Sequence, residues 1–167
     1  YHNTTAVNNT SGVQMDYIKY IRNMVGNNAI NLTGVNVIIY NDKNEILLQK
    51  RGEYPVGKWS LIGGIVELGE SLEHAAQREA YEETSLYISD LQLLGTTSGK
   101  HAYMEFPNGD QAYFISIAFY TNQYAGELSI DYKETLDLKF FAKDSMPENI
   151  PSTHKQMIKK FYNDVSI

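Results

Sequence analysis

The segment Gly63–Leu86 is dense in carboxylates, with six glutamates between Glu67 and Glu83 and one arginine, Arg78. On a helix that turns by about 100° per residue, one side of this segment carries small apolar residues together with two carboxylates, and the other side is polar. The first side consists of Leu72, Ala75, Ala76, Glu79 and Glu83, and the second of His74, Gln77, Tyr81 and Thr84. The segment could be a solvated acidic surface. Carboxylates turned towards the protein body without partners, however, would cost several kcal/mol each, so the pattern indicates a compensating charge.

A divalent cation is the compensation that the spacing favours. Three of the glutamates stand at i, i+3 and i+4, namely Glu79, Glu82 and Glu83. On a helix they would share a patch roughly 5–6 Å across. Carboxylate oxygens of this kind suit Mg²⁺ or Mn²⁺, which share their remaining positions with water and phosphates. Just upstream, Gly63-Gly64 allows a close approach of the backbone. The guanidinium of Arg78 can hold the carboxylate of Glu79 or Glu70 through two hydrogen bonds.

These residues resemble the Nudix box, whose pattern is Gly, five residues, Glu, seven residues and then Arg-Glu-apolar-x-Glu-Glu-x-Gly-apolar. In this chain the pattern reads Gly64, Glu70, Arg78, Glu79, Ala80, Glu82, Glu83, Ser85 and Leu86. The chain departs from the family at Ser85, which replaces a glycine that should end the helix in a left-handed conformation. We expect strain of about 1 kcal/mol there without loss of function. Ile62 also replaces the proline that many members carry. The wider resemblance is to small MutT-like bacterial Nudix proteins, over roughly residues 16–163.

The resemblance implies a hydrolase that splits a phosphoanhydride bond of a nucleoside diphosphate-linked substrate and releases a nucleoside monophosphate. The residues that would bind Mg²⁺ or Mn²⁺ are Gly64 through its carbonyl, Glu79, Glu82, Glu83, and Glu70 as an outer ligand paired with Arg78. The ions would lower the pKa of a bridging water, which attacks phosphorus. The carboxylate that takes the proton of this water would be Glu79 or Glu134, and Glu134 could also be an ordinary surface residue.

Two other functions occur on related folds. Isopentenyl diphosphate isomerases need an active-site cysteine, and this chain has none. The alternative that stays open is a non-catalytic nucleotide sensor or binding module. Such regulators usually lose the box glutamates and carry an added DNA-binding domain, whereas Glu79, Glu82 and Glu83 are all present here.

The residues expected to bind substrate are Arg51, Lys50, Trp59 and Tyr103. A base could stack on an aromatic ring while a cation holds a phosphate, although each of these residues could instead serve packing or face solvent. Tyr103 stands where diadenosine polyphosphate hydrolases often carry a tyrosine, and His101 stands where ADP-ribose pyrophosphatases often carry a proline. We therefore favour dinucleoside polyphosphates slightly and leave nucleoside triphosphates and nucleotide sugars open.

The elements that must position these residues alternate between helical and strand patterns. Helices are expected from Asp16 to Gly26, from about Ser71 to Thr84, and after Pro151, where Met157, Ile158, Phe161 and Tyr162 form one stripe. Strands are expected at 34–40 and 45–50, joined as a hairpin through 41–44, and at 87–94, 96–103, 111–120 and 139–142. This order predicts an α+β fold, an α/β/α sandwich with a mixed β-sheet between helices.

The bulk composition limits the function further. A length of 167 residues suits one domain, expected at 13–167, while the polar residues 1–12 suggest a flexible leader or a remnant of the expression vector. The absence of cysteine fits the cytoplasm. The net charge of −6 argues against nucleic acid as a partner, and no apolar run is long enough for a membrane span. The expected partner is a small-molecule nucleotide, and homodimer formation stays open.

Overall fold

The structure, a computed structural model, describes residues 16–130 and 134–166, so the leader expected at residues 1–12 lies outside the described part. Its largest sheet has the strand order β4-β1-β8-β6, with β7 also paired to β8. The bounds of these strands are β1 Ile30–Ile39, β4 Ile62–Ile65, β6 Gln92–Thr97, β7 Tyr103–Glu105 and β8 Gln111–Thr121. The two central strands, β1 and β8, run parallel and the other pairs are antiparallel, which makes the sheet mixed.

Two smaller sheets and three helices complete the described fold. The second sheet is antiparallel, in the order β10 (Thr135–Phe141), β2 (Ile46–Arg51) and β3 (Trp59–Ser60). A short pair joins β5 (Tyr87–Ile88) to β9 (Tyr124–Ala125). The helices are α1 (Tyr17–Val25), α2 (Leu72–Thr84) and α3 (Ser152–Asp164), and 3₁₀ turns lie at Lys100–Ala102 and Lys143–Ser145.

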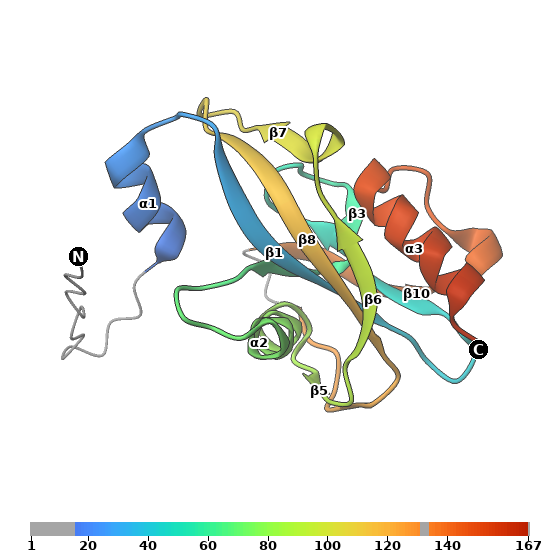
Figure 1. Ribbon diagram of the computed structural model, residues 1–167. Coiled ribbons are helices and arrows are strands. Elements are labelled where there is room, and N and C mark those ends of the chain that lie inside the picture. Colours follow the sequence, from blue (N-terminus) through green and yellow to red (C-terminus); the bar gives the residue numbers. More distant parts are fainter. Residues whose placement is uncertain (1–15, 131–133, 167) are drawn as a thin grey trace.

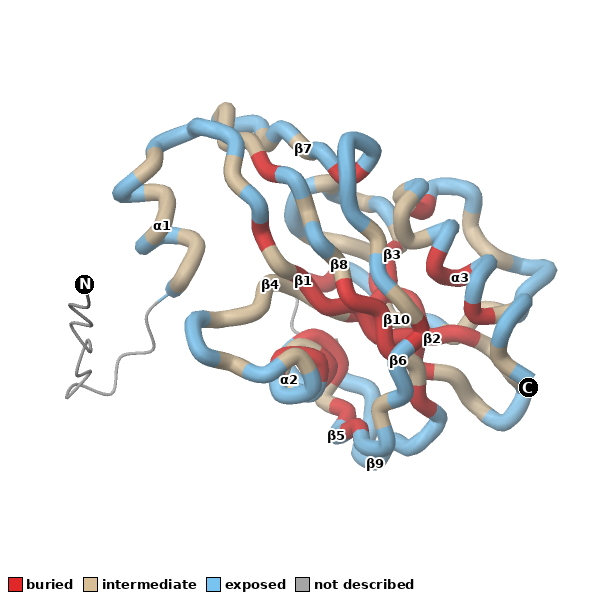
Figure 2. Tube along the Cα trace, viewed as in Figure 1, coloured by how far each residue is buried: buried red, intermediate tan, exposed pale blue. Residues whose placement is uncertain are grey.

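Strand alternation divides the core between two helices. On β1, Val35, Val37 and Ile39 join the cluster that includes the alanines of α2, whereas Ile38 joins the cluster of α3. Figure 2 shows the buried residues concentrated along the central strands and on the side of α2 that faces them. The sheet therefore lies between α2 and α3, and the predicted α+β sandwich is confirmed (Figure 1).

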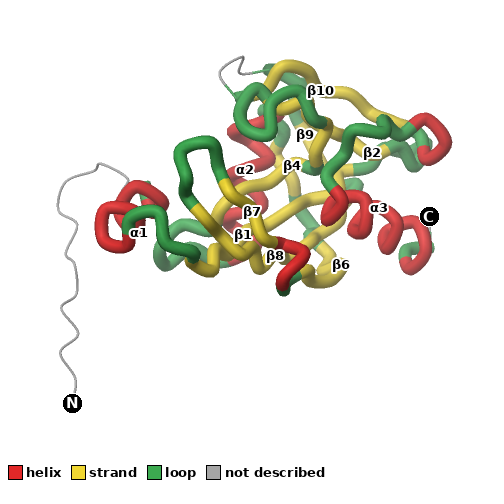
Figure 3. The backbone as a smooth tube through the Cα atoms, turned by 90° about the horizontal axis from the view of Figure 1, so that it is seen from above, coloured by secondary structure: helices red, strands yellow, loops and turns green. Residues whose placement is uncertain are grey.

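The terminal helices occupy opposite ends of the molecule (Figure 3). The stripe predicted on α3 holds, since Met157, Ile158 and Phe161 are buried. Helix α1 begins at the N-cap Asp16 and ends at Gly26 as predicted, but it contains no buried residue. None of the described helices has the length and hydrophobicity to cross a membrane.

Three predicted strand arrangements were wrong. The segment 87–94, expected as one strand, is divided between β5 and β6, which belong to different sheets. The segments expected as a hairpin form β1 and β2, which belong to different sheets and meet only at the single bridge between Tyr40 and Ile46. Both strands are almost wholly buried, and each gains more by pairing elsewhere, β1 with β8 and β2 with β10. The segment 96–103 is also not one strand, because it leaves β6 after Thr97 and turns through Lys100–Ala102.

Candidate active site

Helix α2 carries the acidic segment and has a clear local origin. The N-cap Ser71 accepts a hydrogen bond from the His74 N–H (3.2 Å), and the helix ends at Ser85 in the left-handed conformation (φ 63°, ψ 14°) that was expected of it. The buried alanines of its inner side belong to the core. Thr84 was placed on the outer side and is instead buried, and its hydroxyl is satisfied by donating to the Ala80 carbonyl.

Arg78 is the centre of the hydrogen-bond network on this helix. Its guanidinium donates to both oxygens of Glu70 (2.8 and 2.9 Å), to Glu79 Oε1 (2.8 Å) and to Glu82 Oε2 (3.1 Å). A further bond reaches the carbonyl of Ile65 (3.0 Å). The hydrogen bonds from Arg78 lower the pKa of Glu70. Arg78 therefore fixes Glu70 and Glu79 together, where the sequence left the choice between them open.

Glu79 and Glu83 are turned inward and line one cavity. The Glu79 carboxylate lies so close to the backbone of Gly64 that a Cβ at Gly64 would collide with it. The Gly63 N–H donates to Glu83 Oε2 at 2.9 Å. The double glycine thus serves as the surface against which both carboxylates are seated.

Burial dominates the electrostatics of these two carboxylates. It raises the pKa of Glu83 to about 8, against the opposing effects of the nearby Gln49 amide and the Gly63 N–H. It also raises the pKa of Glu79, although the charge and hydrogen bond of Arg78 oppose the rise. A positive charge placed nearby would strongly favour the ionised form of both side chains.

The expected convergence of three carboxylates is not present. The Glu82 side chain is 55% exposed and its carboxylate is held by Arg78, outside the cavity. Within residues 16–130 and 134–166, no three acidic or histidine side chains are close enough together to hold a metal ion. The i+3 position lies at the edge of the helix face, so Glu82 is drawn to the neighbouring guanidinium instead.

The donor set nevertheless fits a divalent cation. Glu83 is only 8% exposed, and among the described residues no lysine or arginine forms an ion pair with it. Glu79 faces the same cavity, and oxygen donors are the ligands that hard divalent ions prefer. Glu79, Glu83 and the Gly64 carbonyl would hold such an ion, with Glu82 available at the rim.

The cavity has a volume of about 600 Å³, which suits a nucleotide-sized ligand. Of the residues predicted from the sequence, Arg51, Gly64, Glu79, Glu83, Tyr103 and Glu134 line it. Aromatic side chains form part of its wall, with ring centroids 5.9 Å apart for Tyr54 and Phe106 and 6.5 Å apart for Phe106 and Phe114. The cavity therefore combines carboxylates, one arginine and an aromatic surface.

Lys50 and Trp59 were expected to bind substrate but lie outside this cavity. They face each other across the β2–β3 pair, one position away from the Gln49–Ser60 pair, and side chains alternate along a strand. The indole of Trp59 packs edge-on against Phe141 at 4.8 Å. We leave both residues out of the proposed substrate site.

The sequence reasoning missed several cavity residues, among them His154 and Ser60. His154 enters the cavity from α3, and its Nδ1 accepts the N–H of Leu61, which is 93 positions away in the chain. Ser60 is fully buried and lines the same cavity. Neither residue belongs to a local pattern, and only the packing of α3 against the sheet brings them together.

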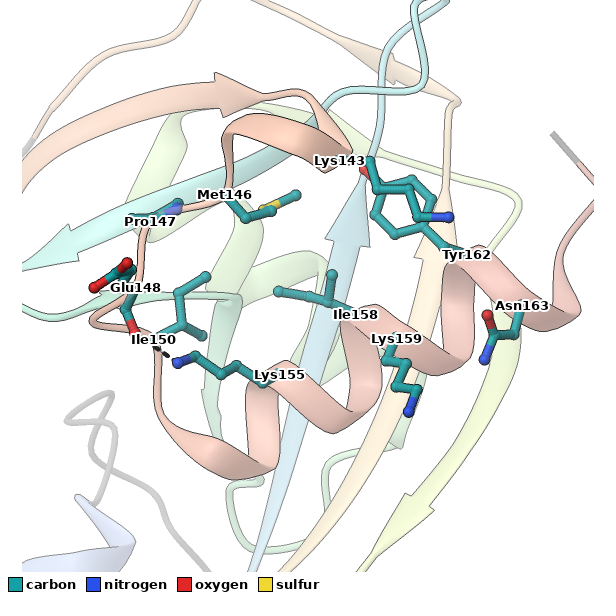
Figure 4. A pocket seen from close by; sticks show the side chains of 10 residues that line it. All are labelled: Lys143, Met146, Pro147, Glu148, Ile150, Lys155, Ile158, Lys159, Tyr162 and Asn163. Carbon is teal, nitrogen blue, oxygen red and sulfur yellow. Dashed lines mark hydrogen bonds between the residues drawn. The ribbon is translucent and has the colours of Figure 1, made fainter.

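A second hollow, of about 380 Å³, lies between α3 and the segment that precedes it (Figure 4). Its apolar floor includes Ile150 and Ile158, and the Lys155 ammonium donates to the Glu148 carbonyl across it (2.6 Å). None of the residues predicted from the sequence to act in catalysis or binding lines this hollow. This hollow is therefore separate from the carboxylates of the acidic helix.

Comparison with known proteins identifies the family. The family model of the NUDIX domain matches residues 31–161. A Bacillus subtilis (strain 168) protein, provisionally named as an 8-oxo-dGTP diphosphatase, is 33% identical over 130 residues, which are 78% of this chain and 79% of that protein. The NAD-capped RNA hydrolase NudC of Vibrio vulnificus (strain CMCP6) is 30% identical over 116 residues, 70% of this chain and 41% of that protein. The chain thus spans about two-fifths of the length of this NudC relative.

A solved structure shows the same fold. The MutT NUDIX hydrolase from Burkholderia pseudomallei superposes with a TM-score of 0.69 at 24% identity, covering 78% of this chain and 98% of the other. The family and the hydrolase class expected from the box agree with the descriptions of these relatives. The chain belongs to the NUDIX domain family.

Proposed function

We propose that this protein is a Nudix hydrolase that cleaves the phosphoanhydride bond of a nucleoside diphosphate-linked substrate with Mg²⁺ or Mn²⁺. The proposal rests on one observation: Glu79 and Glu83 line a nucleotide-sized cavity, and Arg78 donates a hydrogen bond to Glu79. The family generally uses a divalent metal, and the oxygen donors of the cavity fit these two ions. We assign this activity to one domain at residues 13–167. The cysteine-free sequence supports a cytoplasmic location.

The residues of the chain would divide the work as follows. Glu79, Glu83 and the Gly64 carbonyl would hold the metal, with Glu82 joining from the rim. Glu70 would keep Arg78 in place rather than bind the ion directly, because both of its oxygens already accept from that guanidinium. The bound metal would polarise the diphosphate and lower the pKa of the attacking water.

Glu134 is the carboxylate best suited to take the proton from that water. It lines the cavity and lies close enough to Glu79 for its charge to raise the pKa of Glu79. Glu79 accepts a hydrogen bond from Arg78 and would also bind the metal, so its oxygens would be occupied and less available to accept a proton. Arg51, from the end of β2, would bind a phosphate of the substrate at the same cavity.

The aromatic residues of the same cavity support a substrate that contains a nucleobase. Tyr54, Phe106 and Tyr103 offer surfaces on which a nucleobase can stack, without selecting one base. Nucleoside triphosphates, dinucleoside polyphosphates and nucleotide sugars all pair such a base with a phosphoanhydride. The NudC relatives are named for NAD-capped RNA, so a capped RNA end belongs among the compounds to test, although the sequence argued against nucleic acid.

A substrate panel tests the proposal. Nucleoside triphosphates, oxidised dGTP, ADP-ribose, NAD, dinucleoside polyphosphates and an NAD-capped RNA would each be incubated with Mg²⁺ and with Mn²⁺. We expect a nucleoside monophosphate plus the remaining phosphorylated fragment from at least one of them. Binding without turnover throughout the panel would refute the hydrolase and support the nucleotide sensor.

A further inference from the structure

His154 has an orientation that fixes where its proton lies. Its Nδ1 accepts the N–H of Leu61 at 3.1 Å, so a neutral ring must carry its hydrogen on Nε2. Burial, aided by the charge of Arg51, lowers the pKa of His154 to about 4, so the ring is neutral at neutral pH. The imidazole therefore offers one N–H donor, and no other hydrogen bond joins it to the residues that the structure describes.

Two further donors line the same cavity without a partner among the described residues. The Ser60 hydroxyl is buried and unbonded, and so is Arg51 Nε, although another nitrogen of that guanidinium donates to the Tyr54 carbonyl (3.3 Å). Leaving buried polar atoms without a hydrogen bond is unfavourable, and most proteins avoid it. Such donors, all on residues that line one cavity, indicate an acceptor that arrives with the ligand.

An anionic oxygen is the acceptor that matches this set. The three groups supply an imidazole N–H, a hydroxyl and a guanidinium N–H, and an oxyanion accepts all of these while donating nothing. The edge of a nucleobase, by contrast, presents donors and acceptors side by side and would leave some of its own donors unmatched. The guanidinium beside the imidazole adds the positive charge that favours phosphate.

We propose that His154, Ser60 and Arg51 form a phosphoryl-binding subsite, in which the neutral imidazole of His154 donates its Nε2 proton to an oxygen of the substrate diphosphate. This inference rests on the proposed function, because it assigns residues that line the same cavity. His154 is here a substrate-binding residue and not the base, since its free nitrogen carries a hydrogen.

Matched variants separate a binding role from a structural one. In His154→Asn, the amide oxygen can still accept the Leu61 N–H, but no atom reaches the position of Nε2. In His154→Gln, the longer amide can place an N–H near that position. Ser60→Ala removes the unbonded hydroxyl of the cavity, and Thr97→Val is its control, because the Thr97 hydroxyl is also buried and unbonded but lies outside the cavity.

Calorimetric titration with inorganic pyrophosphate and with adenosine, each in Mg²⁺, measures the effect. We expect His154→Asn to weaken pyrophosphate binding about tenfold, His154→Gln to regain part of the loss, and Ser60→Ala to weaken it several-fold. Adenosine binding should not change, Thr97→Val should bind pyrophosphate like the wild type, and all four proteins should keep melting temperatures close to the wild-type value. With the best substrate, His154→Asn should raise KM while kcat stays nearly constant.

Three results would overturn the subsite: no binding of pyrophosphate to the wild type, unchanged pyrophosphate affinity in His154→Asn, or a loss of adenosine affinity instead. These failures differ from a failure of the proposed function. A wild-type protein that turns over its substrate while His154→Asn keeps the wild-type KM refutes only the subsite, whereas absence of turnover in the wild type refutes the hydrolase.

Discussion

Replacing Glu83 with glutamine should stabilise the metal-free protein, and the gain should grow between pH 5 and pH 8. The carboxyl of Glu83 is 8% exposed, and burial raises its pKa from 4.5 to about 8. A raised pKa means that the folded state holds the proton more tightly than the unfolded state. Wild-type stability is therefore lost as the pH rises above about 4.5 towards 8, and the neutral glutamine removes this loss.

The size of the effect has an upper limit that follows from the pKa. The difference between 4.5 and about 8 corresponds to on the order of 5 kcal/mol at pH 8. For a domain of this size, each kcal/mol moves the melting temperature by about 2–4 °C. Glutamine also keeps an oxygen that can accept the Gly63 N–H, so the substitution preserves the contact at 2.9 Å. Even a third of the limit would be measurable.

Thermal unfolding in EDTA at several pH values between 5 and 8 is the assay. The difference between Glu83→Gln and the wild type should be small at pH 5 and should widen with rising pH, while an exposed control on the same helix, Glu73→Gln, should give a flat difference. Added Mg²⁺ should raise the wild-type melting temperature at pH 8 more than that of Glu83→Gln. Parallel curves for Glu83→Gln and wild type across the pH range would refute the reasoning from burial.

Three other predictions concern the geometry around Arg78. Gly64→Ala should displace the Glu79 carboxylate and lower kcat at least tenfold, with little change in stability. Gly63→Ala should instead lower the melting temperature sharply, because its Cβ would collide with the backbone of β1. Equal melting temperatures for the two variants would contradict this packing. Arg78→Lys cannot make the two-pronged bond to Glu70, so kcat should fall more than metal affinity measured by titration. Glu79→Gln should lose on the order of 10²–10⁴-fold in kcat while Glu73→Gln stays nearly normal, and equal losses would mean that the helix face is wrongly assigned.

The parts of the fold and site that the sequence predicted are those with local causes. The limits of α2 follow from the cap at Ser71 and the left-handed residue Ser85, and the inward direction of Glu79 and Glu83 follows from helical spacing. Arg78 and Glu70 are only eight residues apart, separated by the N-cap Ser71 and the first turns of α2, so their pairing also has a local cause.

The parts that the sequence missed depend on distant packing. The hairpin prediction failed because the pairing of a buried strand depends on the packing of the whole sheet. Strand β1 pairs with β8, which lies in the second half of the chain. Trp59 resembles a stacking residue in sequence, but strand alternation turns it towards Phe141. His154 carries no local signal at all, because its contact with Leu61 exists only once α3 docks on the sheet.

Hydrolysis of the best substrate in ¹⁸O-labelled water, with and without a divalent metal, tests the central claim most directly. We predict that Mg²⁺ or Mn²⁺ is required, that ¹⁸O appears on a phosphate of one product, and that a nucleoside monophosphate is released. We also predict that Glu83→Gln abolishes most of the turnover. Turnover that is unchanged in EDTA or in Glu83→Gln, or release of orthophosphate from simple monoesters, would contradict it.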